Sequence, residues 1–248
     1  MALHVDASPD PLSRHDGHDG LHGRPAFEPV IERYPDRTRI NHWAVAMLFV
    51  CAALSGLAIF HPLFYFFTAF FGGGPWTRIL HPFFGVLMVL GFIVLFFQVW
   101  RENIWKPRDT AWVRKAPVLL RGDEEGMPDV GKYNAGQKVV FWLFGLSLVL
   151  LLVTGFMFWR PWFAELFPIV VRRIAVLVHA IAAVVLILSV IVHVYAAIWV
   201  KGSIQAMTRG TVSGHWARRH HLLWYRDIQE NRADEADHLR PEAVADKR

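Results

Sequence analysis

The sequence predicts an all-α fold: an integral membrane bundle of four transmembrane helices. The first observation is composition, since 54% of the 248 residues are hydrophobic and the mean hydropathy is +0.30, above soluble domains. The second is that the excess lies in four long apolar runs, and a helix needs about 20 apolar residues to cross a bilayer. The third is that many of the 11 Trp and 19 Phe lie near the run ends, as in aromatic belts at membrane surfaces.

Residues 1–38 precede the first run and are polar, with many Pro, Gly, Asp and His. This composition predicts a flexible, His-rich N-terminal arm on the cytoplasmic side. Its histidines lack the spacing of a metal site and are expected to be solvated: His4, His15, His18 and His22. No basic segment followed directly by an apolar core opens the chain, so the first span is expected to insert without signal-peptide cleavage.

The predicted membrane domain covers residues 39–200. Its four spans are placed at about residues 40–60, 76–100, 139–159 and 174–200. A Phe-rich stretch, residues 63–71, is too short to cross a bilayer and is expected at its surface or against another subunit. A charged loop with three prolines, residues 101–138, joins the second and third spans, and residues 201–248 form a basic cytoplasmic tail.

The distribution of Lys and Arg predicts the orientation. Five lie in the arm through Arg39, eight in the 101–138 loop and nine in the tail, whereas four lie on the opposite side. Because positively charged loops stay in the cytoplasm, both termini and this loop are expected on the cytoplasmic side of the membrane. The net charge of +5 is explained by this clustering beside the spans and not by a nucleic-acid surface.

Two histidines interrupt the last span, His179 and His193, fourteen residues apart. In an α-helix they lie about 21 Å apart along the axis and within roughly 40° of the same face. Ionisable residues inside a span are costly and indicate a functional site. Two on one face suggest two metal-centred cofactors at two depths, although each imidazole could instead hydrogen-bond a neighbouring helix.

Two further histidines supply partners at these depths. His81 starts the second span on the outer side, and His42 starts the first span on the inner side. A six-coordinate haem takes one axial imidazole on each face. The predicted iron ligands are therefore His81 with His179 for the outer haem, and His42 with His193 for the inner haem. Zinc is disfavoured because no depth offers the three or four ligands of a zinc site.

His61 is the competing outer ligand. It lies at the end of the first span beside Pro62, and its 19-residue offset from His42 turns it about 100° from the face of that residue. We therefore favour His81 as the outer ligand. His61 is expected at the membrane surface or against a partner subunit.

Other residues of the spans have structural interpretations beside functional ones. Glycines allow close helix packing and leave room for a flat porphyrin: Gly56, Gly85, Gly91, Gly145 and Gly155. Hydroxyls are expected to bond to their own helix backbones: Ser55, Thr154 and Ser189. Basic residues flank the membrane where haem propionates would emerge: Arg39, Arg160, Arg172, Arg173 and Lys201. The single cysteine, Cys51, excludes an internal disulfide, a CxxCH haem attachment and a self-contained iron–sulfur cluster in this chain.

A group of local motifs accompanies the four spans and the histidine set. They are Gly131-Lys132-Tyr133-Asn134-Ala135-Gly136-Gln137-Lys138, Trp159-Arg160-Pro161, His193-Val194-Tyr195-Ala196-Ala197, Val200-Lys201-Gly202, His220-His221 and Trp224-Tyr225-Arg226. With them, about residues 30–228 resemble the cytochrome b (gamma) subunit of membrane-bound formate dehydrogenase. A four-helix dihaem pattern alone would also fit the cytochrome b of nickel–iron hydrogenases. The His-rich arm departs from the family pattern.

The resemblance implies a membrane anchor and electron-transfer subunit with no catalytic residue for formate. Formate would be oxidised in a molybdenum- or tungsten-dependent (alpha) subunit. Electrons would pass through an iron–sulfur (beta) subunit and two haems b to menaquinone or ubiquinone, with protons taken from the cytoplasm. Asn134 and Gly136 match the family's quinone site, whereas the residues alone indicate a turn and a helix entry there. The alternatives are a cytochrome b for another donor, such as hydrogenase, and a haem-free anchor or transporter.

Overall fold

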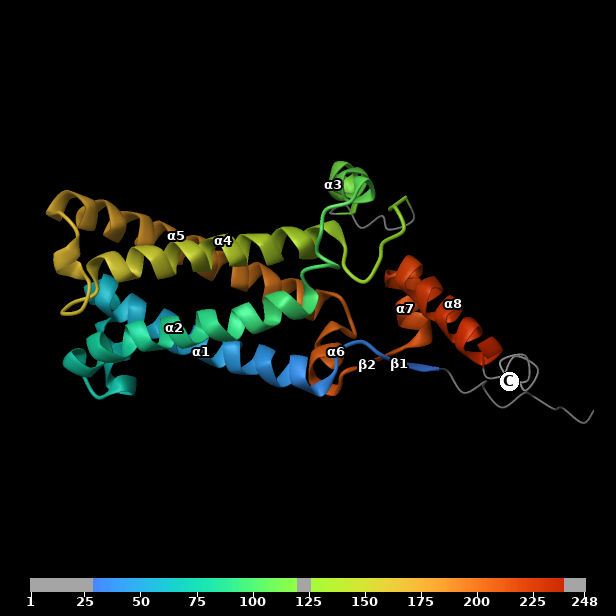
Figure 1. Cartoon of the computed structure of the whole chain (residues 1–248), viewed down its shortest axis with the longest axis horizontal. Coiled ribbons are helices and arrows are strands. Elements are labelled where there is room, and N and C mark those ends of the chain that lie inside the picture. The colour runs from blue at the N-terminus through green and yellow to red at the C-terminus, as the bar shows by residue number, and fades with distance from the viewer. Residues whose placement is uncertain (1–28, 120–125, 239–248) are drawn as a thin grey trace, which may run out of the picture.

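Four long helices dominate the molecule, which the computed structural model shows as an elongated bundle (Figure 1). The structure describes residues 29–119 and 126–238. The four helices are α1 Asp36–Phe60, α2 Gly74–Val99, α4 Ala135–Phe158 and α5 Ile169–Trp199. Each is long and apolar enough to cross a membrane, so the four predicted spans are present. Each begins two to five residues before its predicted start, because the first turn is helical ahead of the apolar run.

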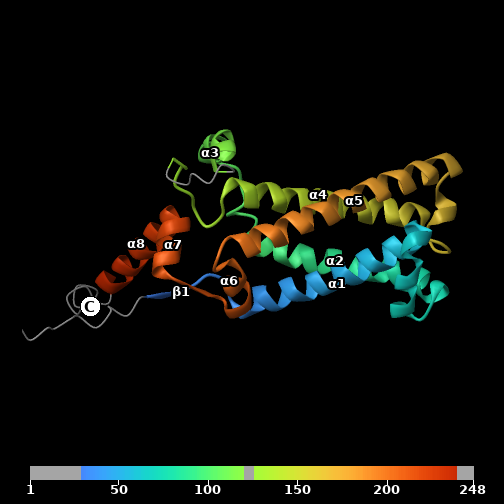
Figure 2. The same ribbon diagram turned by 180° about the vertical axis from the view of Figure 1, so that it is seen from behind.

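The bundle consists of two helical hairpins, α1 with α2 and α4 with α5, and contacts between α2 and α4 help to join them (Figure 2). Its buried apolar cluster comprises Ala52, Met88, Val89, Leu148 and Leu186. Leu186 is seven residues from each histidine of α5. The cluster therefore separates the two predicted histidine depths.

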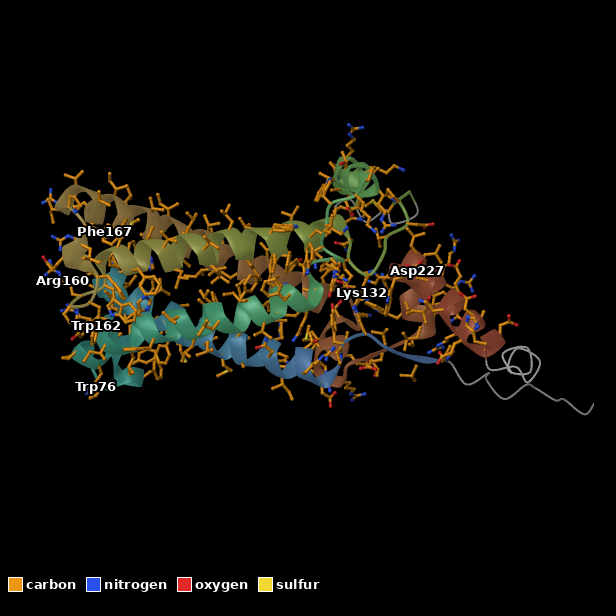
Figure 3. All side chains as sticks on the ribbon, viewed as in Figure 1. Trp76, Lys132, Arg160, Trp162, Phe167 and Asp227 are labelled. Carbon is orange, nitrogen blue, oxygen red and sulfur yellow. The ribbon has the colours of Figure 1, made fainter. Side chains whose placement is uncertain are left out.

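Most side chains of the spans face outward. At most 22% of the most apolar stretch of any span is buried. Figure 3 shows carbon-rich side chains along the middle of the bundle, with Trp76, Arg160 and Trp162 at one end. Exposed apolar helix faces need lipid or another apolar surface to cover them, as in a multi-pass membrane protein.

Shorter helices lie in the connections between spans. The Phe-rich segment after α1 forms a 3-10 helix, η1 Pro62–Phe71, followed by Gly72 and Gly73 with φ of 84° and 95°. These left-handed values favour glycine, which has no Cβ to clash with the backbone. The remaining two connecting helices are α3 Pro107–Leu119 and η2 Ala164–Leu166.

A second folded unit lies where α1 begins and α5 ends (Figure 1), and we call it the end module. Its elements are β1 Val30–Glu32, α6 Ser203–Arg209, β2 Thr211–Ser213, α7 Gly214–His220 and α8 Leu222–His238. The two strands pair antiparallel, with Ile31 opposite Val212. These two residues form the buried core of the module with Ala206 and Ala217. Segments from both ends of the described chain thus share one small core.

Two features differ from the expectations for the termini. The fold is not entirely helical, since residues 30–32 and 211–213 form strands. The described end of the predicted arm, from Pro29, joins the end module and is not a flexible lead-in. A three-residue strand is too short to show the alternating pattern of a sheet, and its partner lies in the tail. Residues 1–28, with their four histidines, lie outside the described residues.

Arg33 is a buried arginine that connects three parts of the chain at the end module. It is 4% exposed, and its Nη2 donates to the carbonyl of Lys132 at 2.6 Å and lies 3.3 Å from His221 Nε2. His221 Nδ1 in turn lies 2.8 Å from the carbonyl of Gly131. Aromatic rings surround the guanidinium at 4.9–5.9 Å: Tyr34, Tyr133, Trp216 and Trp224. The contacts require a neutral His221 that accepts from Arg33 and donates to the loop.

We expect the end module to lose stability in acid through His221. Burial and the Arg33 guanidinium lower the pKa of His221 to about 3. Above the unfolded pKa of about 6.5 the ring is neutral in both states, but below it only the unfolded state binds a proton. Stability should therefore fall by about 1.4 kcal/mol per pH unit between about pH 6.5 and about pH 3, below which both states bind the proton. Hydrogen exchange of α7 amides, corrected for intrinsic rates, would measure this decline.

His221→Gln is expected to flatten that decline, because glutamine can donate and accept without titrating. His238→Gln, at an exposed position of α8, is the matched control and should leave the decline intact. A steep decline that persists in His221→Gln would assign the acid sensitivity to another group.

Candidate functional site

The four predicted ligand histidines come together as two pairs. His81 of α2 faces His179 of α5, with ring centroids 6.4 Å apart. His42 of α1 faces His193 of α5, also with ring centroids 6.4 Å apart. The second pair lies at the helix ends that meet the end module, and the first lies toward the opposite end. We call them the inner pair and the outer pair.

The spacing in each pair fits two imidazoles on opposite faces of one metal. A metal-bound imidazole nitrogen lies about 2 Å from the metal and roughly 1.1 Å from its own ring centre. Two such rings on one axis therefore have centres roughly 6.2 Å apart. Within residues 29–119 and 126–238, no three His, Cys, Asp or Glu side chains gather to hold an ion. The donor set suits haem iron with two axial imidazoles and not a tetrahedral zinc site.

Each outer imidazole rests against a hydroxyl from the other helix of its hairpin. Ser55 Oγ of α1 lies 2.9 Å from His81 Nδ1. Thr154 Oγ1 of α4 lies 3.0 Å from His179 Nδ1. Both hydroxyls also donate to the carbonyl four residues earlier on their own helix, at 2.6 and 2.5 Å. A hydroxyl has one proton, so each oxygen accepts from the imidazole Nδ1–H, and the lone pair of Nε2 stays free to bind a metal.

A glycine beside each hydroxyl makes room for the imidazole. A Cβ on Gly56 would lie 3.1 Å from Cε1 of His81, and one on Gly155 would lie 3.4 Å from Cε1 of His179. The first contact is tighter than ordinary van der Waals packing. The glycines predicted to serve helix packing therefore also make room for the outer imidazoles.

The inner pair is positioned differently. Asn41 Nδ2 donates to the carbonyl of Gly91 at 2.9 Å, which fixes α1 against α2 one residue from His42. Phe144 of α4 contacts His193 edge-on, with ring centroids 5.8 Å apart. The buried Nδ1 of His42 has no hydrogen-bond partner among the described residues. No hydroxyl of the described chain supports the inner imidazoles as Ser55 and Thr154 support the outer ones.

His61 does not join either pair. Its side chain is exposed, and its Nδ1 accepts from the backbone N–H of Leu63 at 3.2 Å, so it caps η1. The ring lies 6.3 Å from that of Phe64. The structure brings His81, and not His61, to His179.

Asn134 and Gly136 lie at the start of α4, on the same side of the bundle as the inner pair. Asn134 Oδ1 accepts from the N–H of Gln137 at 2.9 Å, and Gln137 Oε1 accepts from the N–H of Asn134 at 3.0 Å. This is a capping box, the helix entry that the residues alone indicated. A Cβ on Gly136 would lie 3.3 Å from Cη2 of Trp112, so α3 covers this glycine.

A buried ion pair holds α3 against α4 beside this loop. Lys138 Nζ lies 2.8 Å from Asp109 Oδ2, and both side chains are 2% exposed. Lys138 also donates to the carbonyl of Ile104 at 3.0 Å, and Asp109 accepts from the N–H of Lys106 at 2.6 Å. Such a pair persists only when these extra bonds compensate for its desolvation. It fixes the segment that carries Trp112 over the start of α4.

Comparison with known proteins bears on this arrangement. The family described as prokaryotic cytochrome b561 matches residues 33–210. The formate dehydrogenase cytochrome b556(fdo) subunit of Escherichia coli K12 is 44% identical over 208 residues, which cover 84% of this chain and 98% of the relative. The chain belongs to the family of formate dehydrogenase cytochrome b subunits. The nitrate-inducible cytochrome b556(Fdn) subunit of the same strain is 43% identical over 195 residues, 79% of this chain and 90% of the relative. The formate dehydrogenase cytochrome b556 subunit of Haemophilus influenzae Rd is 41% identical over 197 residues, which cover 79% of this chain and 83% of the relative.

Membership of this family establishes the general function of the chain. This cytochrome b subunit is a membrane electron-transfer subunit, and a cytochrome b family implies haem b. Four apolar helices in a prokaryotic family fit a multi-pass protein of the bacterial inner membrane. The predicted resemblance is confirmed, and the relatives favour a formate dehydrogenase over the hydrogenase and haem-free alternatives.

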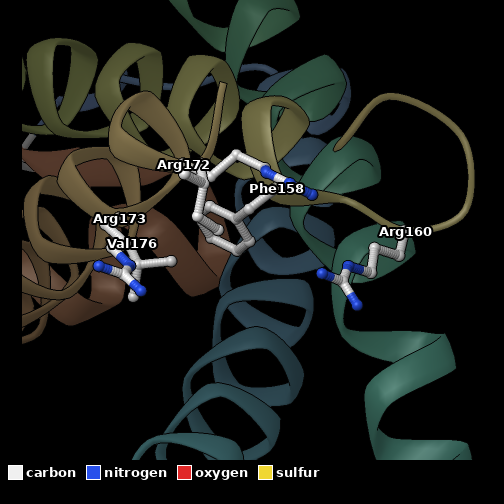
Figure 4. Close-up of a pocket in the computed structure, with 6 residues that line it drawn as sticks. Phe158, Arg160, Arg172, Arg173 and Val176 are labelled. Atoms are coloured by element: carbon white, nitrogen blue, oxygen red, sulfur yellow. The ribbon is translucent and has the colours of Figure 1, made fainter. Parts of the chain in front are cut away.

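An arginine-rich pocket of about 300 Å³ lies beside the outer pair of this cytochrome b subunit (Figure 4). Its lining residues are Phe158, Arg160, Ile169, Arg172, Arg173 and Val176. The ring of Phe158 lies 5.2 Å from that of His179. Arg172 pairs with Glu165 at 3.3 Å, but its buried Nε has no hydrogen-bond partner among the described residues. The pocket therefore presents positive charge and a free donor close to the outer pair.

The hydroxyl partners of the cytochrome's outer imidazoles were not predicted from the sequence. Ser55 and Thr154 do bond to their own helices, as expected, but each also contacts a histidine as a hydrogen-bond acceptor. A signal was present, because Ser55-Gly56 lies 26 residues before His81 and Thr154-Gly155 starts 25 residues before His179. The repeat follows from two hairpins of similar length.

Proposed function

We propose that this subunit holds two haems b, one in each histidine pair, and relays electrons from an iron–sulfur subunit at the outer end to a quinone at the inner end. The observation that carries the proposal is the 6.4 Å separation of ring centroids in both pairs. Haem iron supplies the one-electron redox chemistry when it is bound. The residues of the chain orient the imidazole rings, and the apolar cluster between the two pairs excludes water. Other residues position the electron donor at the outer end and the quinone at the inner end.

The proposed partners follow from the names of the relatives, which are subunits of formate dehydrogenase. This chain would anchor an iron–sulfur subunit and a molybdenum- or tungsten-dependent catalytic subunit to the membrane. The Lys and Arg count supports an inner end in the cytoplasm, where the end module and α3 lie. Moving one electron inward would then require about 2.3 kcal/mol per 100 mV of membrane potential. This work would be stored as membrane potential.

The arginine pocket supports placement of the outer haem. Haem propionates are anionic, and arginine binds carboxylates with two parallel hydrogen bonds. Arg160, Arg172 and Arg173 gather next to Phe158, which contacts His179. We assign these arginines as propionate partners of the outer haem, as expected from their position beside the membrane.

The quinone site is proposed at the start of α4. Asn134 uses its Oδ1 for the helix cap, so its amide Nδ2 is the group that would donate to a quinone carbonyl. Protons for the quinol would come from the cytoplasmic side, next to which the segment lies. Trp112 covers Gly136 so closely that a Cβ there would lie 3.3 Å from its ring, and a quinone ring would bind beside this position.

Haem content tests the proposal directly. We expect the purified complex to contain two haems b for each copy of this chain by the pyridine haemochrome assay. Neither should be bound covalently, because the chain has no CxxCH sequence. One haem per chain, or none, would refute the two-pair assignment.

A further inference from the structure

The two histidine pairs differ in what lies behind the imidazoles. Ser55 and Thr154 oxygens lie 2.9 and 3.0 Å from Nδ1 of His81 and His179. The inner pair has no such partner among the described residues, and His42 Nδ1 is buried without a hydrogen bond. One hairpin supplies Ser55 and the other Thr154, so the same device is built twice on the outer side.

We propose that Ser55 and Thr154 are positioning residues that lower the reduction potential of the outer haem below that of the inner haem. The inference rests on the proposed function, since it requires a haem in each pair. It assigns to the outer pair a role in setting the direction of electron flow, in addition to binding.

The physical basis is the hydrogen-bond relay behind each ligand. Each imidazole N–H donates to a hydroxyl, and that hydroxyl donates to the carbonyl of Cys51 or Leu150. The relay polarises the imidazole and makes its ligating nitrogen more basic. A more basic ligand stabilises the ferric state over the ferrous state, and so lowers the potential.

The relay also fixes the two imidazoles in orientation. With Nδ1–H committed to the hydroxyl, only Nε2 can bind iron. Gly56 and Gly155 let each ring approach the helix that carries its hydroxyl. Ligand basicity and ring orientation therefore depend on the same two short contacts.

The asymmetry favours inward electron transfer. Electrons that enter at the outer end would meet the haem with the lower potential first. They would move to a haem of higher potential at the inner pair, next to the proposed quinone site. The difference would partly offset the work of moving charge against the membrane potential.

Redox titration of the intact complex, by optical and electron paramagnetic resonance spectra, tests this inference. We expect Ser55→Ala and Thr154→Val each to raise the reduction potential of the outer haem by about 59 mV. At a fixed applied potential, this is a tenfold higher ratio of reduced to oxidised outer haem, because haem iron takes up one electron. The inner haem should not shift. Thr154→Ser keeps the hydroxyl and should retain the wild-type potential.

The matched control is Ser189→Ala. Ser189 is a buried hydroxyl of α5 that donates to the carbonyl of Val185 at 2.7 Å without contacting an imidazole. It should leave both potentials unchanged. Equal shifts in Ser189→Ala, or no outer shift in Ser55→Ala and Thr154→Val, would overturn the inference.

Haem content separates this inference from the proposed function. A wild-type complex with two haems and unaltered potentials in the variants would refute only the tuning role. Loss of the outer haem in both Ser55→Ala and Thr154→Val would likewise refute it, because the hydroxyls would then serve retention. A wild-type complex with fewer than two haems would refute the proposed function itself.

Discussion

His81→Ala is expected to remove the outer haem and leave the inner one, so haem content should fall from two to one per chain. The six-coordinate, low-spin signal of the outer iron needs an imidazole on each face. His179→Ala should remove the same signal, because the structure places these two rings 6.4 Å apart. Electron paramagnetic resonance and the pyridine haemochrome assay of the intact complex measure both effects.

His61→Ala is the matched control, since it removes a histidine from the same side of the bundle. His61 caps η1 through its Nδ1 and lies in neither pair, so both haems should remain. His42→Ala should remove only the inner signal. A complex that keeps both haems in His81→Ala, or loses one in His61→Ala, would show that the outer ligand is misassigned.

Asn134→Asp is expected to slow reoxidation of the haems by quinone about tenfold, equivalent to about 1.4 kcal/mol. Aspartate retains the cap oxygen but loses the amide donor proposed to hold a quinone carbonyl. Both haems should stay bound and reducible by the natural electron donor. Stopped-flow measurement of reoxidation after formate reduction gives the rate.

Two further variants separate the cap from the donor. Asn134→Ala loses both, and the lost cap alone costs about 1 kcal/mol of stability. Gly136→Leu should clash with Trp112, because even a Cβ would lie 3.3 Å from its ring. If reoxidation slows in Asn134→Ala but not in Asn134→Asp, the asparagine acts only as a cap. If it stays at the wild-type rate in all three variants, the quinone binds elsewhere.

The membrane segments and the pairing of the histidines were accessible from the sequence. Four long apolar runs can be buried only in a bilayer, and helix periodicity is regular enough to place His179 and His193 on one face. Depth then paired each with a histidine of another span. These inferences depend on local composition and on helix geometry, which need no knowledge of distant contacts.

Only the tertiary structure decided which groups lie behind those histidines. Ser55 reaches His81, and Thr154 reaches His179, because neighbouring helices of a hairpin approach closely at Gly56 and Gly155. The rotation of one helix about its axis relative to another sets such contacts. Hydropathy leaves that rotation undetermined, because lipid and protein interiors are both apolar.

The end module likewise has features that only the tertiary structure reveals. Its sequence indicated a flexible arm and a polar tail, but the structure pairs Ile31 with Val212 and buries Arg33 against His221. Each strand has three residues and each apolar contribution is small, so neither segment carries a detectable pattern alone. The core exists only when both ends of the membrane domain meet on one side. Because the number of spans is even, the segments before α1 and after α5 lie on the same side of the membrane domain. Their pairing buries apolar side chains, such as Ile31 and Val212, that each segment alone would expose to water.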